Sequence, residues 1–184
     1  MKKKVILDLG CGHDKLPTQK GEKVIGVDYI KTPKVDVVHN LEKPLPFSNG
    51  FADKIYSNHT LEHVENAKGL IEEIWRVAKS NSEIFIRVPH HSSTSAFTDL
   101  THKTFFSSRS FDYYVKGAPL NEMSGYEGKV RFKMLKKHIV FNPPYKIIEA
   151  LVNINEQTRK IYEFFFCWIF PARDLEFTLK PEKN

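Results

Sequence analysis

The pattern of apolar and polar positions along the first half of the chain predicts strands separated by loops and one clear helix. Runs of apolar and β-branched residues, each bounded by polar or turn-forming residues, are typical of strands. Such runs cover about residues 4–9, 23–28, 35–39, 51–58 and 83–89. From Ala67 to Ala78, apolar residues recur at the spacing of an amphipathic helix. This alternation predicts an α/β fold with a doubly wound, mostly parallel sheet.

The pattern in the second half predicts two further strands around a helical segment. Apolar residues alternate with basic ones from Val130 to Met134, and the phase shifts at about residues 135–137, which indicates a bulge or turn. A helical stretch is expected over about residues 145–166, and residues 175–179 alternate as the last strand. The complete sheet is therefore expected to have seven strands and to end in a C-terminal antiparallel hairpin.

Length and composition narrow the class of protein without identifying its chemistry. The 184 residues are expected to form a single domain, residues 1–184, with a lid or acceptor-binding insertion at about 90–128, where no strong periodicity is found. The net charge of +6 permits an anionic partner without requiring one. The apolar run 164–170 is far too short for a membrane span and is expected to pack in the core. With two cysteines and no signal-peptide pattern, a cytoplasmic location is expected.

The most informative stretch joins the first two predicted strands. The first strand ends at Asp8 and the turn Gly10–Gly12, and the second ends at Asp28. Glycines let the backbone approach a ligand closely, and an acid at the tip of the next strand can accept hydrogen bonds from a ribose diol. The dinucleotide fingerprint needs a small third residue where this chain has Lys15, which argues against NAD. The crossover between the strands is also short, with room for about one helical turn.

The order Asp8-x-Gly10-x-Gly12 after a strand resembles the first motif of the class I S-adenosylmethionine-dependent methyltransferases. The segments 61–63, 73–79 and 99–106 are similar to those of small type 11 methyltransferases, which have Pro where this chain has Leu100. The resemblance covers residues 4–115. It implies a Rossmann-like methyltransferase fold, S-adenosyl-L-methionine as cofactor, and methyl transfer. The cofactor-binding residues that it implies are Asp8, Gly10, Cys11, Gly12, Asp28, Asn40, Leu41 and Asn58.

Histidines near the ends of the fourth and fifth strands are candidates for the rest of the site. His102 and His59 are the candidate catalytic residues, since an imidazole can take the proton of a methyl acceptor. The candidate acceptor-binding residues are His63, His90, His91 and Asp99. His90, His91, His102 and Asp99 could instead bind a divalent ion or only stabilise loops, and no metal is assigned. The string from His59 to His63 matches an inverted zinc-peptidase motif, but its first histidine ends a strand.

The sequence does not identify the methyl acceptor or the oligomeric state. A small molecule or a saccharide is expected as acceptor ahead of nucleic acid, because the basic residues are spread along the chain. Two alternatives remain open on the same fold: a nucleotide-binding domain of other chemistry, and a non-catalytic RNA-binding module. Steep salt dependence of RNA binding would support the second.

Overall fold

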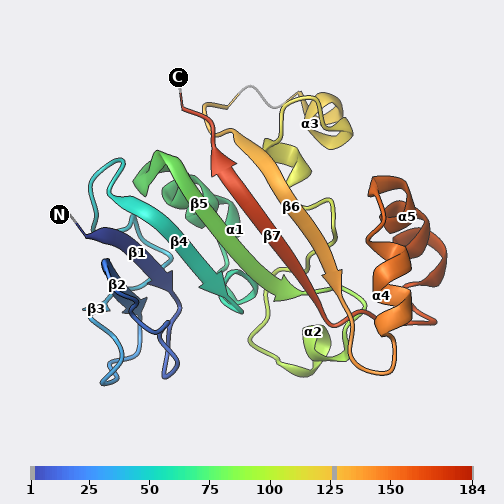
Figure 1. Cartoon of the computed structure of the whole chain (residues 1–184), viewed down its shortest axis with the longest axis horizontal. Coiled ribbons are helices and arrows are strands. Elements are labelled where there is room, and N and C mark those ends of the chain that lie inside the picture. The colour runs from blue at the N-terminus through green and yellow to red at the C-terminus, as the bar shows by residue number, and fades with distance from the viewer. Residues whose placement is uncertain (1–2, 126–127, 184) are drawn as a thin grey trace.

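The computed structural model describes residues 3–125 and 128–183, which form one seven-stranded sheet in the order β3-β2-β1-β4-β5-β7-β6 (Figure 1). The strands are β1 Lys4–Leu9, β2 Glu22–Asp28, β3 Val37–Val38, β4 Ala52–Asn58, β5 Ala78–Pro89, β6 Phe132–Val140 and β7 Asp174–Pro181. Strands β1 to β5 pair in parallel, and β7 runs antiparallel to both β5 and β6. The register of β6 shifts between Met134 and Lys136, which confirms the expected bulge. The predicted fold class is confirmed.

In the part of the chain that the structure describes, five α-helices and three 3₁₀- or π-helical segments connect these strands. They are η1 Leu61–His63, α1 Ala67–Val77, α2 Thr94–Thr98, η2 Asp112–Tyr114, α3 Pro119–Ser124, α4 Lys146–Val152, α5 Glu156–Ile161 and the π-helical segment η3 Tyr162–Phe166. Helix α1 begins after Asn66, whose side chain accepts a hydrogen bond from Gly69 N and so satisfies one free amide of the first turn. Its apolar face packs on the sheet, behind it in Figure 1, and contributes to the main core.

The connections at the start of the chain carry no helix. Residues 10–21 form only turns, so the structure has less helix here than the single turn for which the sequence leaves room. Among the described residues, no helix covers the front of β4, β5 and β7 in Figure 1. Side chains on this face are half-buried and partly polar: Tyr56 stacks on Phe85, and Arg87 pairs with Glu176. The strand order is that of a doubly wound sheet, but its helical cover is incomplete.

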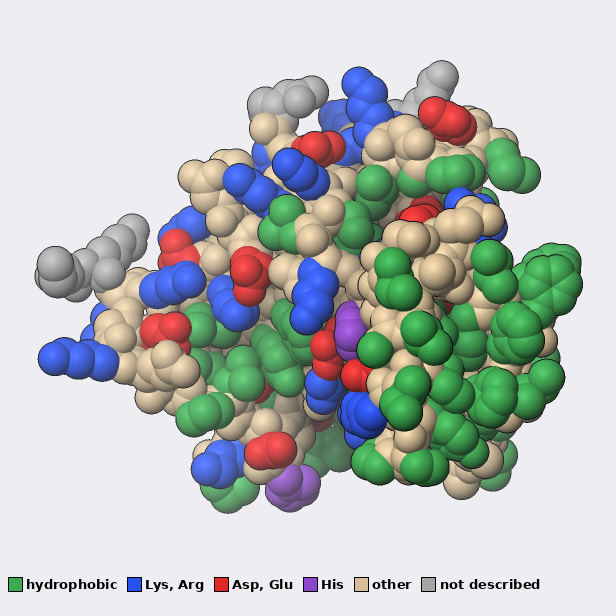
Figure 2. Space-filling view, turned by 45° about the vertical axis from the view of Figure 1, so that its right-hand side comes forward, with side chains coloured by type: hydrophobic (Ala, Val, Ile, Leu, Met, Phe, Trp, Pro, Cys, Tyr) green, Lys and Arg blue, Asp and Glu red, His purple; other side chains and the backbone are tan. Residues whose placement is uncertain are grey.

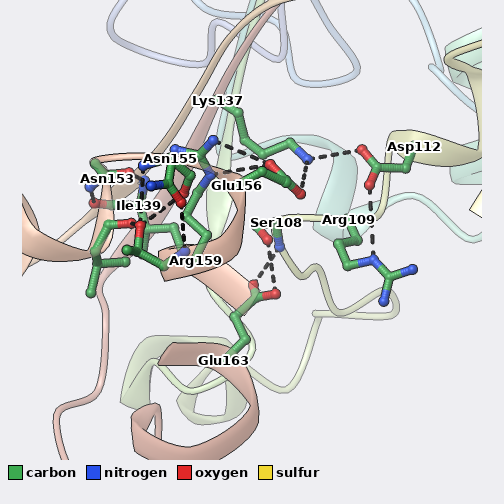
Figure 3. A network of polar contacts seen from close by, with 12 residues as sticks. Ser108, Arg109, Asp112, Lys137, Ile139, Asn153, Asn155, Glu156, Arg159 and Glu163 are labelled. Carbon is green, nitrogen blue, oxygen red and sulfur yellow. Dashed lines mark hydrogen bonds and ion pairs between the residues drawn. The ribbon is translucent and has the colours of Figure 1, made fainter. Parts of the chain in front are cut away.

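Buried polar contacts fasten the segment between β5 and β6 to the C-terminal helices (Figure 3). Lys137 Nζ lies 2.9 Å from Asp112 Oδ1 and 3.2 Å from Glu156 Oε1. The side chains of Lys137 and Asp112 are only 6% and 8% exposed. Ser108 donates hydrogen bonds from its amide and its hydroxyl to the two oxygens of Glu163. These contacts hold the segment against β6 and the C-terminal helices; residues 126 and 127 of the expected insertion lie outside the described residues.

The apolar run 164–170 is not core, contrary to the expectation from sequence. Its most exposed side chains are Phe164, Phe165, Trp168 and Ile169, and Phe164 is 80% exposed. Because consecutive apolar residues wind around a helical segment, only one side of the run can face the protein, and Tyr162 and Cys167 occupy that side. Figure 2 shows the apolar surface that results, over η3 and the neighbouring helices α4 and α5. Among the described helices, none is long and apolar enough to cross a membrane.

Candidate functional site

Two hollows meet at the Gly10 turn, where the parallel strands end. The larger, here the main cavity, has a volume of about 790 Å³ and is lined by Gly10, Asp28, Tyr29, Asn40, Leu41, Glu42, His59, Thr60, His63, Val64, Thr101 and Lys103. The smaller, here the side pocket, has a volume of about 210 Å³ and is lined by Asp8, Gly10, Cys11, Asp14, Lys15, Leu16, Pro17, Tyr56 and Asn58. Ligands of such sheets bind at the carboxyl ends of the strands. Seven of the eight expected cofactor residues line one hollow or the other, and Gly12 lines neither.

Gly10 is required by packing as well as by its backbone conformation. Its φ is +74°, and a Cβ there would lie 2.2 Å from Thr60 Oγ1. The Thr60 hydroxyl donates to Leu9 O at 3.0 Å, so this side chain is held against the turn. The structure therefore gives a packing reason for glycine at position 10, which is the close approach of Thr60. That contact adds to the expectation that a glycine here admits a ligand.

Asp28 holds two backbone amides and still faces the main cavity. Its Oδ2 accepts a hydrogen bond from Gly12 N, and its Oδ1 accepts one from Ile30 N, both at 2.9 Å. Each carboxylate oxygen can accept two hydrogen bonds, so one acceptor position on each oxygen remains for a ligand. Asp28 is thus placed to fix the Gly10–Gly12 turn and to accept the two hydroxyls of a ribose at the same time.

Acceptor atoms also gather in the side pocket. Asp8 is buried, and its Oδ2 accepts a hydrogen bond from Leu16 N at 2.7 Å. Burial raises the pKa of Asp8 to about 6 although that hydrogen bond opposes the rise. Asn58 Oδ1 is buried and has no hydrogen-bond partner among the residues that the structure describes. A carboxylate and an unused amide oxygen fit an ammonium group, such as the amine of S-adenosylmethionine. Burial raises the pKa of Cys11 to about 11, so this thiol stays neutral.

His59 lies at the end of β4 in a left-handed conformation, with φ of +51°. Its Nδ1 lies 3.1 Å from Glu62 Oε1, and its Nε2 lies 3.7 Å from Asp174 Oδ1. The hydrogen bond to Glu62 raises the pKa of His59, against the opposing effect of burial, and Asp174 adds to the rise. His59 lines the main cavity, and its two carboxylate neighbours favour its protonated form.

The segment with His102 is docked on η1 by backbone hydrogen bonds. Lys103 N and Thr104 N both donate to Glu62 O, at 2.7 and 3.2 Å. This contact brings His63, which lines the main cavity, against His102, with ring centroids 4.7 Å apart. The ring of His102 is largely buried and is not among the residues that line the main cavity. Asp99 is exposed and accepts hydrogen bonds from the amide and hydroxyl of Thr101, which stabilise the turn.

His90 and His91 lie in a different cluster, against η3. His90 is fully buried; its Nδ1 accepts a hydrogen bond from Ser92 N, and its Nε2 lies 3.2 Å from Glu163 Oε1. His91 Nε2 lies 3.8 Å from Cys167 Sγ. Neither histidine is among the residues that line the two hollows. The structure therefore separates the group expected from sequence: His102 gathers with Glu62 and His63, whereas His90 and His91 gather with Glu163.

Sequence reasoning missed several residues that line the main cavity. Tyr29 directly follows Asp28 and is 72% exposed, so an aromatic face is available beside the ribose acid. The sequence did contain a signal for Tyr29, because it is an aromatic residue directly after a strand that ends in an acid. Thr60 gave no signal, because its contact with Gly10 joins residues that are far apart in the chain. Lys103 and Thr101 lie in a segment that was singled out, but only the docking on η1 shows that they reach the cavity.

Comparison with known families matches residues 7–86, from β1 into β5, to the type 11 family described as "Methyltransferase domain". Comparison with curated proteins gives no match. Among solved structures, the YcgJ protein of Bacillus subtilis is 16% identical, with a TM-score of 0.60 over 100% of this chain and 93% of that chain. A SAM-dependent methyltransferase of Archaeoglobus fulgidus is 19% identical, with a TM-score of 0.55 over 97% and 86%.

A Haloferax volcanii methyltransferase, solved in complex with the Trm112 methyltransferase activator, is 14% identical to this chain. Its TM-score is 0.59 over 99% of this chain and 84% of that chain. Similarity at 14–19% identity shows only a shared fold, and the expectation of methyl transfer comes from the family match over residues 7–86. Residues 7–86 therefore match a methyltransferase domain, and the whole chain shares the fold of solved SAM-dependent methyltransferases; S-adenosylmethionine is the cofactor that this similarity implies.

Proposed function

We propose that this protein transfers the methyl group of S-adenosylmethionine to a small molecule or a saccharide that enters the main cavity. The observation that carries the proposal is the arrangement around Gly10. The main cavity reaches from the ribose acid Asp28 to a polar wall formed by His63, Thr101 and Lys103. A cofactor bound at the first end would therefore share the cavity with an acceptor at the second.

The proposed placement of the cofactor uses both hollows. Asp28 would accept the ribose hydroxyls, Tyr29 would stack on the adenine, and Asn40 and Leu41 would border it. The amine would lie in the side pocket, within reach of Asp8 and the unpartnered oxygen of Asn58, with Cys11 beside it. Gly12 would act through its amide, which orients Asp28.

The cofactor supplies an activated methyl group, and the chain's own residues position the acceptor. Alignment of a nucleophile with the methyl group can by itself account for a large part of the acceleration. In the proposed site His59 directly follows β4. Its environment favours the protonated form, so in this proposal it donates a hydrogen bond to the methyl acceptor and does not take the acceptor's proton. His102 acts through His63, because it lies behind that residue and outside the cavity lining.

The size of the main cavity favours a small acceptor. Its volume of about 790 Å³ lies within the roughly 300–1,000 Å³ that is usual for small-molecule sites. A basic hollow lined by Lys116, Lys129, Lys133, Lys180 and Lys183, among others, offers a surface for an anionic partner. Its lining includes the last residues of β7, whereas the main cavity lies where β1, β2 and β4 end; Figure 1 shows that these strand ends are at opposite ends of the sheet. Nucleic acid bound there would be far from the proposed cofactor site, which argues against nucleic acid as the methyl acceptor.

Calorimetric titration with S-adenosylhomocysteine, with NAD as control, tests the proposal. The unmodified protein should bind the first ligand alone. Asp28→Ala should weaken binding about 10- to 100-fold, which corresponds to the roughly 1–3 kcal/mol of a charged hydrogen-bond partner. Asp53→Ala is the matched control, because Asp53 also accepts a backbone hydrogen bond, from Val5 N, at the other end of the sheet. Unchanged affinity in Asp28→Ala, or a preference for NAD, would contradict the proposal; Tyr29→Ala tests the same pocket if the first variant does not fold.

A further inference from the structure

Glu62, His63 and His102, here the Glu62 cluster, form a compact group beside the main cavity that cofactor binding does not use. One potential metal-ligand atom of each residue lies within 4.8 Å of those of the other two. Glu62 and His63 belong to η1, and His102 is brought to them when Lys103 N and Thr104 N donate to Glu62 O. The cluster therefore depends on one long-range backbone contact between segments that are forty residues apart.

The hydrogen bonds around the two histidines leave a lone pair on each ring. His102 Nδ1 lies 3.0 Å from Ala96 O, which can only accept, so this nitrogen carries the hydrogen. The Thr101 hydroxyl donates to Asp99 Oδ1 at 2.6 Å and therefore accepts from His63 Nδ1 at 2.8 Å. In both neutral rings Nε2 is then unprotonated. A metal-binding histidine typically donates its other N–H in this way, and the second contact fixes its tautomer.

A second observation that points to a metal ligand, independent of the two histidines, comes from Glu62. Its side chain is only 1% exposed, and its Oε2 has no hydrogen-bond partner among the described residues. Oε1 is engaged by His59 Nδ1 at 3.1 Å. Buried carboxylate oxygens are as a rule paired or coordinate a metal, so Oε2 of Glu62, in a cluster with two histidines, is open to a cation in addition to the contact of Oε1 with His59.

In the other histidine cluster, hydrogen bonds within the protein occupy His90 and Glu163, although the buried Nδ1 of His91 has no partner among the described residues. His90 Nδ1 accepts from Ser92 N, which leaves its Nε2 to donate to Glu163. Both oxygens of Glu163 also accept from Ser108. The only carboxylate of this second cluster is therefore fully engaged, in contrast to Glu62, and the cluster serves as a comparison for the first.

We infer that the Glu62 cluster binds a divalent transition-metal ion, with Glu62, His63 and His102 as its ligands. Two imidazoles and one carboxylate suit Zn²⁺, Co²⁺ or Mn²⁺, whereas Mg²⁺ and Ca²⁺ prefer oxygen ligands alone. Zinc ligands at about 2.0–2.1 Å from the ion lie about 3.4 Å from one another in tetrahedral geometry. The ligand atoms lie within 4.8 Å of one another, so each separation would shorten by up to about 1.4 Å when the cluster closes on an ion.

Three protein ligands leave at least one coordination position open, and His63 places it beside the main cavity. If the proposed methyl transfer is correct, on which this step rests, that position takes an oxygen of the acceptor, either a hydroxyl or a carboxylate. A bound divalent ion lowers the pKa of a hydroxyl that it coordinates. The acceptor class that follows is a molecule with an oxygen donor close to the atom that is methylated.

The test is titration of the full chain, freed of metal with a chelator, with Zn²⁺ by calorimetry and with Co²⁺ by visible absorption. One ion should bind, and Mg²⁺ should not compete. His102→Asn and His63→Asn are the informative variants, because the asparagine amide can still donate to Ala96 O or to Thr101 Oγ1 while the Nε2 lone pair is lost. Each should weaken Zn²⁺ binding at least 100-fold and remove the Co²⁺ absorption band, as should Glu62→Gln. His91→Ala, in the second cluster, should bind as the unmodified protein does.

No binding by the unmodified protein, equal binding by folded His102→Asn, or loss confined to His91→Ala would each overturn the inference. Circular dichroism and thermal unfolding show whether each variant is folded. Binding of S-adenosylhomocysteine by the unmodified protein in excess chelator tests the proposed function separately. If the protein binds S-adenosylhomocysteine but not Zn²⁺, only the metal site is refuted. If it binds Zn²⁺ but not S-adenosylhomocysteine, only the cofactor proposal is refuted.

Discussion

Replacing Asp8 by asparagine should stabilise the protein at neutral pH although it removes a charge from the cofactor site. Burial raises the pKa of Asp8 from 3.8 to about 6, so its carboxylate form is penalised in the folded protein. A difference of this size corresponds to about 3 kcal/mol, at about 1.4 kcal/mol for each pKa unit. Asparagine has the same shape, carries no charge and can still accept the hydrogen bond from Leu16 N.

The sign of the pH dependence follows from which state binds the proton more tightly. Because the pKa of Asp8 is higher in the folded protein, its carboxyl group favours folding most below about pH 4. That contribution is lost as the pH rises from about 4 to 6 and stays constant above. Asp8→Asn should therefore raise the free energy of unfolding by up to about 3 kcal/mol at pH 7.5 and change it little at pH 4.

Urea unfolding at pH 4.0 and pH 7.5, followed by circular dichroism, measures this difference. Asp36→Asn is a control of opposite sign, because hydrogen bonds from Lys15 and Gly26 N outweigh the effect of burial and lower the pKa of Asp36. That variant should lose stability at pH 7.5. An equal effect of Asp8→Asn at both pH values, or a loss of stability at pH 7.5, would refute the assignment of a buried, penalised carboxylate. The same variant should also bind S-adenosylhomocysteine more weakly, which would separate a role in function from a role in folding.

Three further predictions concern packing. Gly10→Ala should lower the free energy of unfolding by about 2–5 kcal/mol, from the strain of φ at +74° and the clash with Thr60, and thermal unfolding should show partial rescue by Thr60→Gly. Lys137→Met should cost about 3 kcal/mol in urea unfolding, since it removes the closest cationic partner of the buried Asp112, whereas the exposed Lys146→Met should cost less than about 1 kcal/mol; equal losses would argue against the buried network. Phe164→Ser should change stability by less than about 0.5 kcal/mol, and a loss of about 3–5 kcal/mol would show that this side chain is core after all.

Local sequence signals were sufficient for the strands and for the acids at their carboxyl ends. Strands β1, β2 and β4 begin and end close to the predicted positions, because each is an apolar run with a turn signal at its boundary. Asp8 and Asp28 could be placed near each other for the same reason, as the ends of adjacent parallel strands meet at one edge of the sheet. The antiparallel end of the sheet followed from the order of a helical stretch and a final alternating strand.

The acceptor end of the site could not be predicted in the same way, because its geometry depends on contacts between distant segments. His90, His91 and His102 are close in sequence, yet two hydrogen bonds to Glu62 O draw His102 toward η1 while His90 turns toward Glu163. The local sequence pattern does not indicate which of two neighbouring elements a loop will pack against.

The sequence by itself determined the strand pattern, the Gly10–Gly12 turn and the acids that flank it, since propensity, hydrophobic alternation and turn chemistry act over a few residues. Tertiary structure decided which side of the run 164–170 faces solvent, why Gly10 must lack a side chain, and which histidines share a cluster. Each of these outcomes depends on the position of a partner that is distant in the chain, such as Thr60 for Gly10. That position is set only when the sheet and its connections pack together.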